Sequence, residues 1–291
     1  MYEKLERCPV CGNSNIINYF ICTDYTVSGE SFALSICSHC NLIFTNPRPA
    51  KEIIGKYYNS YNYQPHTNRQ TLTDRLYRFI RSINNRQKIN LINRVADKGK
   101  LLDVGCGTGS FLKLCRQNGW DISGVEPTPS ANQAASSSLG FQVTADLREI
   151  KEHGSFSVIT FWHVLEHIYE LNESIEFAKG LLSKNGKMII ALPNNKSYDA
   201  QKYHECWAAF DVPRHLYHFN QDSFSFLVRE HGLKIQETVP MYFDAYYISL
   251  LSEQYKSGIK SWTKSFINGY KSNIYAKKNN KDYSSLIYVV R

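Results

Sequence analysis

The sequence predicts an α/β protein: a mostly parallel sheet flanked by helices, preceded by a small metal-binding ribbon. Three observations predict this fold class. Short apolar runs alternate with helical patterns from Lys100 onward, a glycine-rich turn follows the first of these runs, and two close cysteine pairs stand within residues 1–50. Alternating strands and helices form parallel sheets because the crossover helices must cover the faces of the sheet.

Length and composition fit one large domain with an attachment, or two domains. The 291 residues are 43% apolar and 13% aromatic, which excludes wholesale disorder and a small disulfide-stapled fold. The net charge of +8 permits an anionic partner without requiring one. No apolar run is long enough to span a membrane, and MYEKLERCPV carries charges where a signal peptide needs an apolar stretch. We therefore expect a cytoplasmic protein with no membrane partner.

The first element, residues 1–50, is predicted to be a zinc ribbon. Two C-x2-C knuckles frame short strand patterns, and each knuckle offers two sulfurs from one tight turn; the four cysteines are Cys8, Cys11, Cys37 and Cys40. Four thiolates satisfy the tetrahedral shell of zinc and close it, so this zinc is expected to be structural. The other cysteines, Cys22, Cys106, Cys115 and Cys206, have no partner spacing and are expected to pack in the interior.

The second element, residues 51–98, is predicted to be a helical linker and substrate lid. It begins with a tyrosine cluster at residues 57–63, followed by His66 as a candidate substrate contact. From Leu72 to Val95 apolar residues return at three- and four-residue steps with arginines interleaved, which indicates an amphipathic helix. The tyrosines either pack on this helix or fold over the cleft.

The third element, residues 99–291, is predicted to be a seven-stranded sheet with its helices. The expected strands are Leu101–Val104, Ile122–Val125, Val143–Thr144, Val158–Phe161, Met188–Leu192, Ile235–Val239 and Ser284–Val290. The basic segment Lys271–Lys281 between the last two strands is expected to be a solvated loop.

The most informative stretch is the turn after the first of these strands. It reads Asp103-Val-Gly-Cys-Gly-Thr-Gly109, a G-x-G-x-G spacing that differs from the dinucleotide fingerprint. Glycines let a backbone take positive φ angles and approach a ligand closely. Seventeen residues after Gly109, Glu126 ends the second strand, where a carboxylate can accept hydrogen bonds from two ribose hydroxyls.

This loop and its acidic partner resemble the class I S-adenosylmethionine-dependent methyltransferases, over roughly residues 99–291. The resemblance implies a Rossmann-like fold in which the loop holds the methionine moiety of the cofactor, Glu126 holds the ribose, and Asp146, after strand three, lies beside the adenine. The cofactor residues it implies in the loop are Asp103, Gly105, Cys106, Gly107 and Gly109. Asp103 can also cap the turn at the strand end.

The turn after strand four holds further polar side chains. Trp162-His163-Val-Leu-Glu166-His167 follows a buried strand, and Trp162 or His163 is expected near the adenine or sulfonium edge of the cofactor. Glu166 and His167 are predicted either as an acid–base pair or as residues that pack and cap a helix start. The H-x-x-E-H spelling also fits a zinc peptidase, but that chemistry needs the motif within a helix and a further ligand.

A second polar cluster follows strand five. The run Pro213-Arg-His-Leu-Tyr-His-Phe219 holds four candidate substrate or catalytic residues, Arg214, His215, Tyr217 and His218. Similar P-R-H-L-x-H-F runs occur in a bacterial branch of the family whose members also carry the cysteine pairs, and some of those methylate nucleotide-linked deoxysugars. Imidazole accepts a proton near neutrality, so His215 is predicted as the base, then His218 or His167. Arg214 is predicted to bind a substrate phosphate or carboxylate.

The sequence therefore predicts a methyltransferase that uses S-adenosylmethionine on a small polar metabolite, first a nucleotide sugar or glycan precursor. The principal alternative is an RNA base methyltransferase that grips RNA with its zinc ribbon, and the modest charge argues against it. A non-catalytic binding module is disfavoured by the intact glycine loop, and a NAD-dependent oxidoreductase by its spacing.

Overall fold

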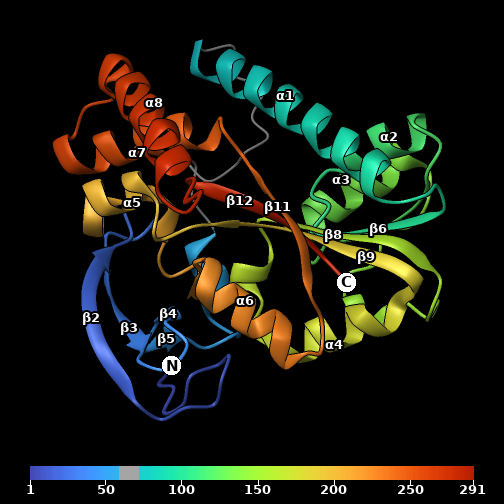
Figure 1. The fold of residues 1–291 in the computed structure, drawn as a ribbon, viewed down its shortest axis with the longest axis horizontal. Helices are drawn as coiled ribbons and strands as arrows, with labels where there is room; N and C mark the ends of the chain where they lie inside the picture. Colours follow the sequence, from blue (N-terminus) through green and yellow to red (C-terminus); the bar gives the residue numbers. More distant parts are fainter. Residues whose placement is uncertain (59–71) are drawn as a thin grey trace.

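The computed structural model describes residues 1–58 and 72–291, and for residues 72–82 the backbone only. Its centre is a six-stranded sheet in the order β11-β12-β9-β8-β6-β7 (Figure 1). The strands are β6 (Lys100–Val104), β7 (Asp121–Val125), β8 (Phe156–Trp162), β9 (Leu182–Pro193), β11 (Ile235–Pro240) and β12 (Ser285–Val290). β12 pairs antiparallel with both of its neighbours, and the pairs among β7, β6, β8 and β9 are parallel. The predicted Rossmann-like α/β class is confirmed.

One of the seven predicted strands, Val143–Thr144, is not a full strand of this sheet. At residues 143 and 144 the described chain makes only a single parallel bridge, between Thr144 and Val125 at the end of β7. One bridge leaves the segment as an extended edge beside β7 and not as a full strand. The described sheet therefore has six strands and not seven.

Helices cover both faces of the sheet because its strands are apolar on both sides. One face packs on α1 (Leu72–Val95), α2 (Ser110–Gln117) and α3 (Pro129–Leu139). The opposite face packs on α4 (Leu171–Leu181) and α6 (Gln221–Glu230). Successive residues Leu101 and Leu102 of β6 enter the two different cores, as the pleat requires. Figure 1 shows α1 and α4 on opposite sides of the sheet.

The N-terminal ribbon is a second sheet in the order β10-β4-β3-β2. Its strands β2 (Ile16–Thr23), β3 (Ser31–Cys37) and β4 (Ile43–Thr45) form a meander. The alternating pattern predicted β2 and β3 but not β4. The fourth strand, β10 (Tyr217–His218), comes from the segment after strand five. A short pair of β1 (Tyr2–Glu3) with β5 (Arg48–Pro49) closes the ribbon. The polar run 213–219, which was predicted to lie at the edge of the main sheet, therefore also supplies a strand to the ribbon.

Helices α5 (Tyr198–Tyr203), α7 (Asp244–Ser257) and α8 (Trp262–Lys278) pack together at one end of the molecule, on the left in Figure 1. The expectation of a solvated loop at 271–281 is wrong for most of its length, because Lys271 to Lys278 form the last turns of α8. Short 3-10 helices complete the described chain at Ile54–Tyr57, Leu147–Glu149, Leu165–His167, His204–Cys206 and Ala208–Phe210. No helix in the described ranges is long and apolar enough to cross a membrane.

Candidate active site

The glycine loop joins β6 to α2 at the carboxyl edge of the parallel strands. Gly105, Gly107 and Gly109 all have positive φ, at +72°, +56° and +76°. A Cβ at Gly105 would lie 2.5 Å from Val164, whereas a Cβ at Gly107 would meet no atom within 4 Å. The outer two glycines are required for the turn and its packing. At Gly107 the backbone borders open space instead, which leaves room for a ligand against the chain.

Glu126 holds this loop from the end of β7. Its Oε2 accepts a hydrogen bond from Gly107 N–H at 2.9 Å, and its Oε1 accepts one from Thr128 N–H at 2.9 Å. The side chain is buried, at 7% exposure. Each carboxylate oxygen has a second lone pair, so the group keeps capacity for hydroxyl donors. The structure thus places the predicted carboxylate against the predicted loop.

Asp103 lies behind the loop, at the end of β6. Thr160 on β8 donates to its Oδ1 at 2.6 Å, and burial raises the pKa of this carboxyl to about 7. Cys106 is buried with its thiol directed toward Gly124, so it packs, and burial raises the pKa of that thiol. Asp146 is half-buried and accepts hydrogen bonds from Arg148, which lowers the pKa of Asp146 to about 2. Asp103 and Cys106 are thus interior residues, whereas Asp146 is partly open to solvent.

Trp162 ends β8 on the side of α1 and α2. Its ring meets Phe111 edge-on at 5.4 Å, and the Lys88 ammonium lies 4.4 Å from the ring centroid. The indole Nε1 is buried and has no hydrogen-bond partner among the described residues. Nothing in the sequence singled out Lys88 as a residue of this site.

His163 lies between two carboxylates, and its backbone has a left-handed conformation. Its φ is +56°, its Nδ1 lies 3.6 Å from Glu166, and its Nε2 lies 3.4 Å from Asp244 of α7. Burial acts to lower the pKa of His163, but the two carboxylates outweigh it and raise that pKa to about 9. Sequence reasoning missed Asp244, because no motif surrounds it and it comes 81 positions later.

His167 and His215 lie beside the buried Glu166, in two segments that a backbone hydrogen bond joins. Leu216 N–H donates to the Glu166 carbonyl at 2.8 Å. One carboxylate oxygen of Glu166 and one ring nitrogen of each histidine lie within 4.8 Å of one another. The imidazole rings of His167 and His215 meet edge-on at 4.6 Å. Neither Glu166 oxygen accepts a hydrogen bond from any described residue.

The two rings are oriented alike by backbone carbonyls. Nδ1 of His167 bonds to the Arg214 carbonyl at 2.9 Å, and Nδ1 of His215 to the Ala209 carbonyl at 2.8 Å. A carbonyl can only accept, so each Nδ1 carries the proton and each Nε2 keeps its lone pair. The Tyr58 hydroxyl lies 3.1 Å from His167 Nδ1. Burial and the charge of His215 lower the pKa of His167 to about 4.

The electrostatics of Glu166 favour its anion. Burial acts to raise the pKa of its carboxyl, yet the nearby His163, with Nδ1 at 3.6 Å, and the charges of His215 and His167 keep that pKa below its usual value. The Nε2 lone pairs of His167 and His215 lie beside this carboxylate and can accept a proton.

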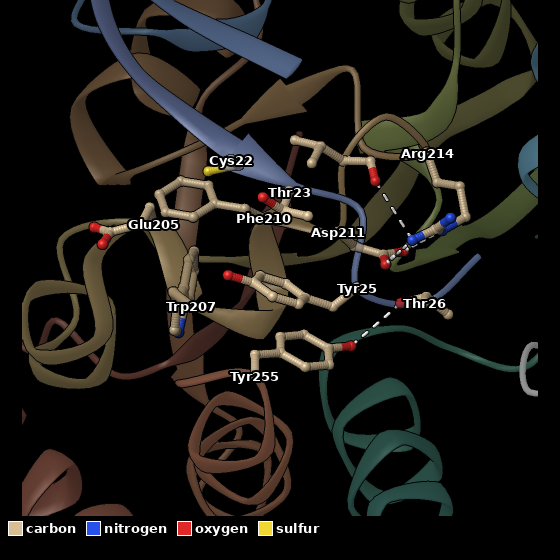
Figure 2. Close-up of a pocket in the computed structure, with 11 residues that line it drawn as sticks. Cys22, Thr23, Tyr25, Thr26, Glu205, Trp207, Phe210, Asp211, Arg214 and Tyr255 are labelled. Carbon is tan, nitrogen blue, oxygen red and sulfur yellow. Dashed lines mark hydrogen bonds and ion pairs between the residues drawn. The ribbon is translucent and has the colours of Figure 1, made fainter. Parts of the chain in front are cut away.

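The guanidinium of Arg214 is used inside the protein. It is wholly buried and donates to Asp211 at 2.6 Å, to Asp24 at 2.9 Å and to the Tyr57 carbonyl at 2.9 Å. Figure 2 shows the bond to Asp211 beside a small cavity where the ribbon meets the segment 205–214 and Tyr255 of α7. Two internal carboxylates already neutralise the cation, so Arg214 joins elements and does not face a substrate anion.

Tyr217 and His218 also lie inside the protein. Both belong to β10 and are buried, at 2% and 4% exposure. The Tyr217 hydroxyl donates to the Tyr169 carbonyl and accepts from Arg48, and His218 Nε2 lies 3.3 Å from the Thr45 hydroxyl. Burial holds the pKa of His218 well below its usual value. These side chains seat β10 in the ribbon. The predicted contact at His66 lies outside the described residues.

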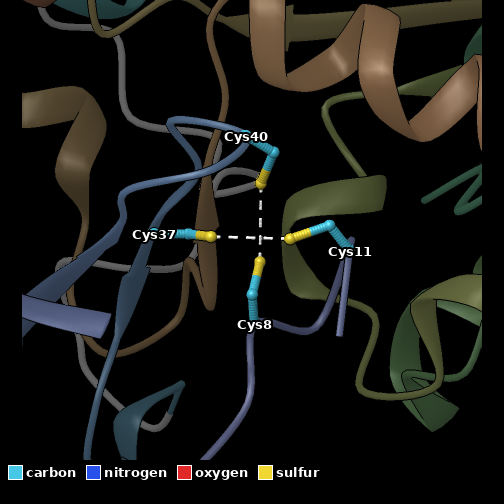
Figure 3. Close-up of side chains that lie close together, drawn as sticks. All are labelled: Cys8, Cys11, Cys37 and Cys40. Atoms are coloured by element: carbon cyan, nitrogen blue, oxygen red, sulfur yellow. Dashed lines mark hydrogen bonds between the residues drawn. The ribbon is translucent and has the colours of Figure 1, made fainter. Parts of the chain in front are cut away.

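The four ribbon cysteines converge on one point, as Figure 3 shows. Sγ of Cys8 lies 3.5 Å from that of Cys40, and Sγ of Cys11 lies 3.5 Å from that of Cys37. These separations are too long for disulfides, whose sulfurs lie about 2.05 Å apart. A tetrahedral site with metal–sulfur distances of about 2.3 Å has edges of about 3.8 Å, close to those found. The donor set is therefore the one that a structural zinc takes.

Comparisons with known proteins agree with this geometry. A family model described as a methyltransferase domain matches residues 73–238. A ubiquinone biosynthesis O-methyltransferase of Paraburkholderia phymatum is 30% identical over 109 residues, covering 34% of this chain and 47% of that protein. One of Bradyrhizobium diazoefficiens is 24% identical over 102 residues, covering 33% and 40%. The chain spans less than half the length of these curated relatives.

Among solved structures, magnesium protoporphyrin IX methyltransferase from Synechocystis PCC 6803, with bound SAH, superposes with a TM-score of 0.54 at 15% identity. The match covers 82% of this chain and 98% of that one. At this identity the likeness concerns the fold.

Proposed function

The chain belongs to the methyltransferase domain family, and on that premise we propose that it transfers the methyl group of S-adenosylmethionine to a small polar acceptor. The observation that carries this proposal is the loop at Gly107, where open space borders a backbone whose N–H is held by Glu126. When bound, S-adenosylmethionine supplies a methyl group on a sulfonium sulfur. The protein then has to align the acceptor and take up its proton.

The residues proposed to hold the methyl donor line the carboxyl edge of β6, β7 and β8. The loop residues and Glu126 carry the main part, and Trp162 offers an indole N–H that no described residue accepts. The full proposed set is Asp103, Gly105, Cys106, Gly107, Gly109, Glu126, Asp146, Trp162 and His163.

A matched pair of glycine variants tests this assignment. Gly107→Val places a side chain in the open space of the loop, whereas Gly119→Val adds the same side chain at the end of α2. Gly119 also has a positive φ, +82°, and open surroundings, so both variants carry similar backbone strain. Calorimetric titration with S-adenosylhomocysteine should show binding lost in the first variant and kept in the second. Binding kept in Gly107→Val would refute the loop assignment.

For the acceptor we propose a nucleotide sugar or glycan precursor, with His215 as the base. His215 supports this role because its Nδ1 bond to Ala209 leaves Nε2 free to accept a proton, and Glu166 lies beside it. Where the acceptor group is a hydroxyl, His215 would take its proton at Nε2. The bound donor would supply the methyl group and keep its sulfur as a neutral thioether.

A screen with labelled methyl donor tests the acceptor class. Nucleotide sugars should be labelled, and catechol-type phenols belong in the screen because the curated relatives are named for O-methylation of ubiquinone precursors. RNA belongs there as well, because a zinc ribbon and a charge of +8 are compatible with phosphate contacts. Label in RNA alone would replace the small-molecule proposal with the RNA alternative.

We also propose that a structural zinc occupies the four-cysteine site of Cys8, Cys11, Cys37 and Cys40. The converging sulfurs and their separations support it. All four ligand positions belong to the protein, so this zinc stabilises the fold and takes no part in the transfer.

A further inference from the structure

Helix α8 turns its small and polar residues toward the protein. Its buried residues are Ser265, Asn268, Gly269, Ser272 and Ala276. Ser272 donates to Asp199, and the Asn268 amide donates to Tyr203 and Glu253. A Cβ at Gly269 would lie 2.9 Å from the backbone of Tyr246 on α7, so the two helices are in close contact there. The packing of α8 against α5 and α7 therefore uses its small and polar residues and does not use its large apolar ones.

Those large residues lie on the opposite, outward side. Phe266, Tyr270 and Ile274 are four residues apart and form one row, with Ile267 beside it. Phe266 is 65% exposed, Tyr270 55% and Ile267 51%. Large apolar side chains that are exposed side by side are typical of an interaction surface. A shallow hollow runs along this row between α8 and Tyr198 of α5.

A row of lysines borders the apolar row. Lys264, Lys271 and Lys278 recur every two helical turns and so lie along one line of α8. Residues 254–281 contain seven lysines and no aspartate or glutamate. Trp262 at the start of α8 and Ile259 before it extend the apolar surface, at 45% and 71% exposure. We call this surface, formed by Ile259, Trp262, Phe266, Ile267, Tyr270, Ile274 and the three lysines, the α8 face.

We propose that the α8 face docks on the surface of an anionic lipid bilayer. Aromatic and aliphatic side chains enter the boundary between headgroups and acyl chains, while lysines beside them meet lipid phosphates. A second copy of the chain is the weaker occupant, because pairing two such faces would bring their six lysines together with no acid from residues 254–281 to offset them. The sequence predicted no membrane partner from the absence of a spanning segment, and surface docking needs no such segment.

Vesicle co-sedimentation of the full chain tests the proposal. The protein should sediment with phosphatidylcholine vesicles that contain about one-third phosphatidylglycerol, and far less with phosphatidylcholine alone. The triple variant Lys264→Gln, Lys271→Gln, Lys278→Gln should bind anionic vesicles on the order of 100-fold more weakly. Each lysine near such a surface adds a similar amount to the binding free energy, so the loss of three multiplies the effect of one. Phe266→Ser with Ile274→Ser should weaken binding as well, because it removes the inserted apolar area.

The matched control neutralises three exposed lysines elsewhere, Lys151→Gln, Lys184→Gln and Lys234→Gln, which leaves the net charge equal to that of the first triple variant. Equal loss in both triples would mean nonspecific attraction and would overturn the proposal. So would equal sedimentation with both vesicle types, or none with either. A wild-type dimer in sedimentation velocity that Phe266→Ser with Ile274→Ser dissociates, without vesicle binding, would assign the face to self-association instead.

Discussion

At the scale of single residues, His163 couples the site to pH because two carboxylates hold its proton. Its pKa is raised from 6.5 to about 9 in the folded chain. The folded state thus binds more protons than the unfolded state between these values, so this contribution to stability is complete below about pH 6.5 and is lost as the pH rises through about 9.

His163→Gln should therefore flatten the pH dependence of unfolding. Between about pH 6.5 and 9, the wild type should lose about 1–2 kcal/mol more than the variant, a value discounted from the full shift because the side chain is partly exposed. Urea unfolding at a series of pH values measures it. Parallel curves for the two proteins would mean that His163 keeps an ordinary pKa.

His215→Ala tests the proposed base. Removal of an acceptor for the hydroxyl proton should lower kcat on the order of 100-fold or more, while affinity for S-adenosylhomocysteine stays unchanged. His153→Ala, on the exposed surface near Phe177, serves as the control and should leave both quantities unchanged. Full turnover in His215→Ala would transfer the role of base to another group.

At the scale of elements, Arg214 ties the β2–β3 turn to the segment before β10. Arg214→Met would leave the buried carboxylate of Asp24 and the partly buried one of Asp211 without their cation, which costs about 3–5 kcal/mol of the free energy of unfolding. Arg94→Met removes an exposed pair with Glu237 and should cost about 0–1 kcal/mol. Chemical denaturation compares them, and equal small losses would show that the junction does not depend on the ion pairs.

The same junction shows what local sequence patterns could and could not predict. The strands from β6 to β9 and the glycine loop have signatures within a few residues, and they were predicted correctly from apolar runs and glycine spacing. The pairing of β10 with β4 joins Tyr217 to Phe44, and the ion pair of Arg214 joins it to Asp24. Such contacts join segments that are far apart in the sequence, and no local pattern indicates them. The histidine-rich run was therefore interpreted as a functional site throughout. Its His215 alone stays near Glu166 and His167.

Helix α8 illustrates a second limit. The basic character of residues 271–281 suggested a solvated loop, because the charge was interpreted without knowledge of what α7 and α5 would cover. The buried small residues Ser265, Gly269 and Ser272 give an apolar pattern too weak to indicate a helix. Packing against α7 supplies that helix with its stability, as tertiary contacts commonly do.

At the scale of the whole molecule, the ribbon and the main sheet share one core. The buried Cys8, Cys37 and Cys40 belong to the same apolar cluster as β8, β9 and β12, and β10 crosses from the site segment into the ribbon sheet. Loss of the metal would therefore loosen the segment that carries His215 as well as the knuckles. A zinc that binds only the folded chain stabilises all of it by mass action.

Removal of the zinc should consequently shift the unfolding of the entire chain. Metal analysis should find about one zinc per chain. After chelation, calorimetry should show a single transition at a lower temperature, with weakened methyl transfer, and added zinc should restore both. Cys37→Ser should reproduce the chelated state, whereas Cys115→Ser, a buried thiol outside the ribbon, should retain the metal. A separate low-temperature transition with transfer unchanged would instead make the ribbon an independent module, since only a shared core forces the two parts to unfold together.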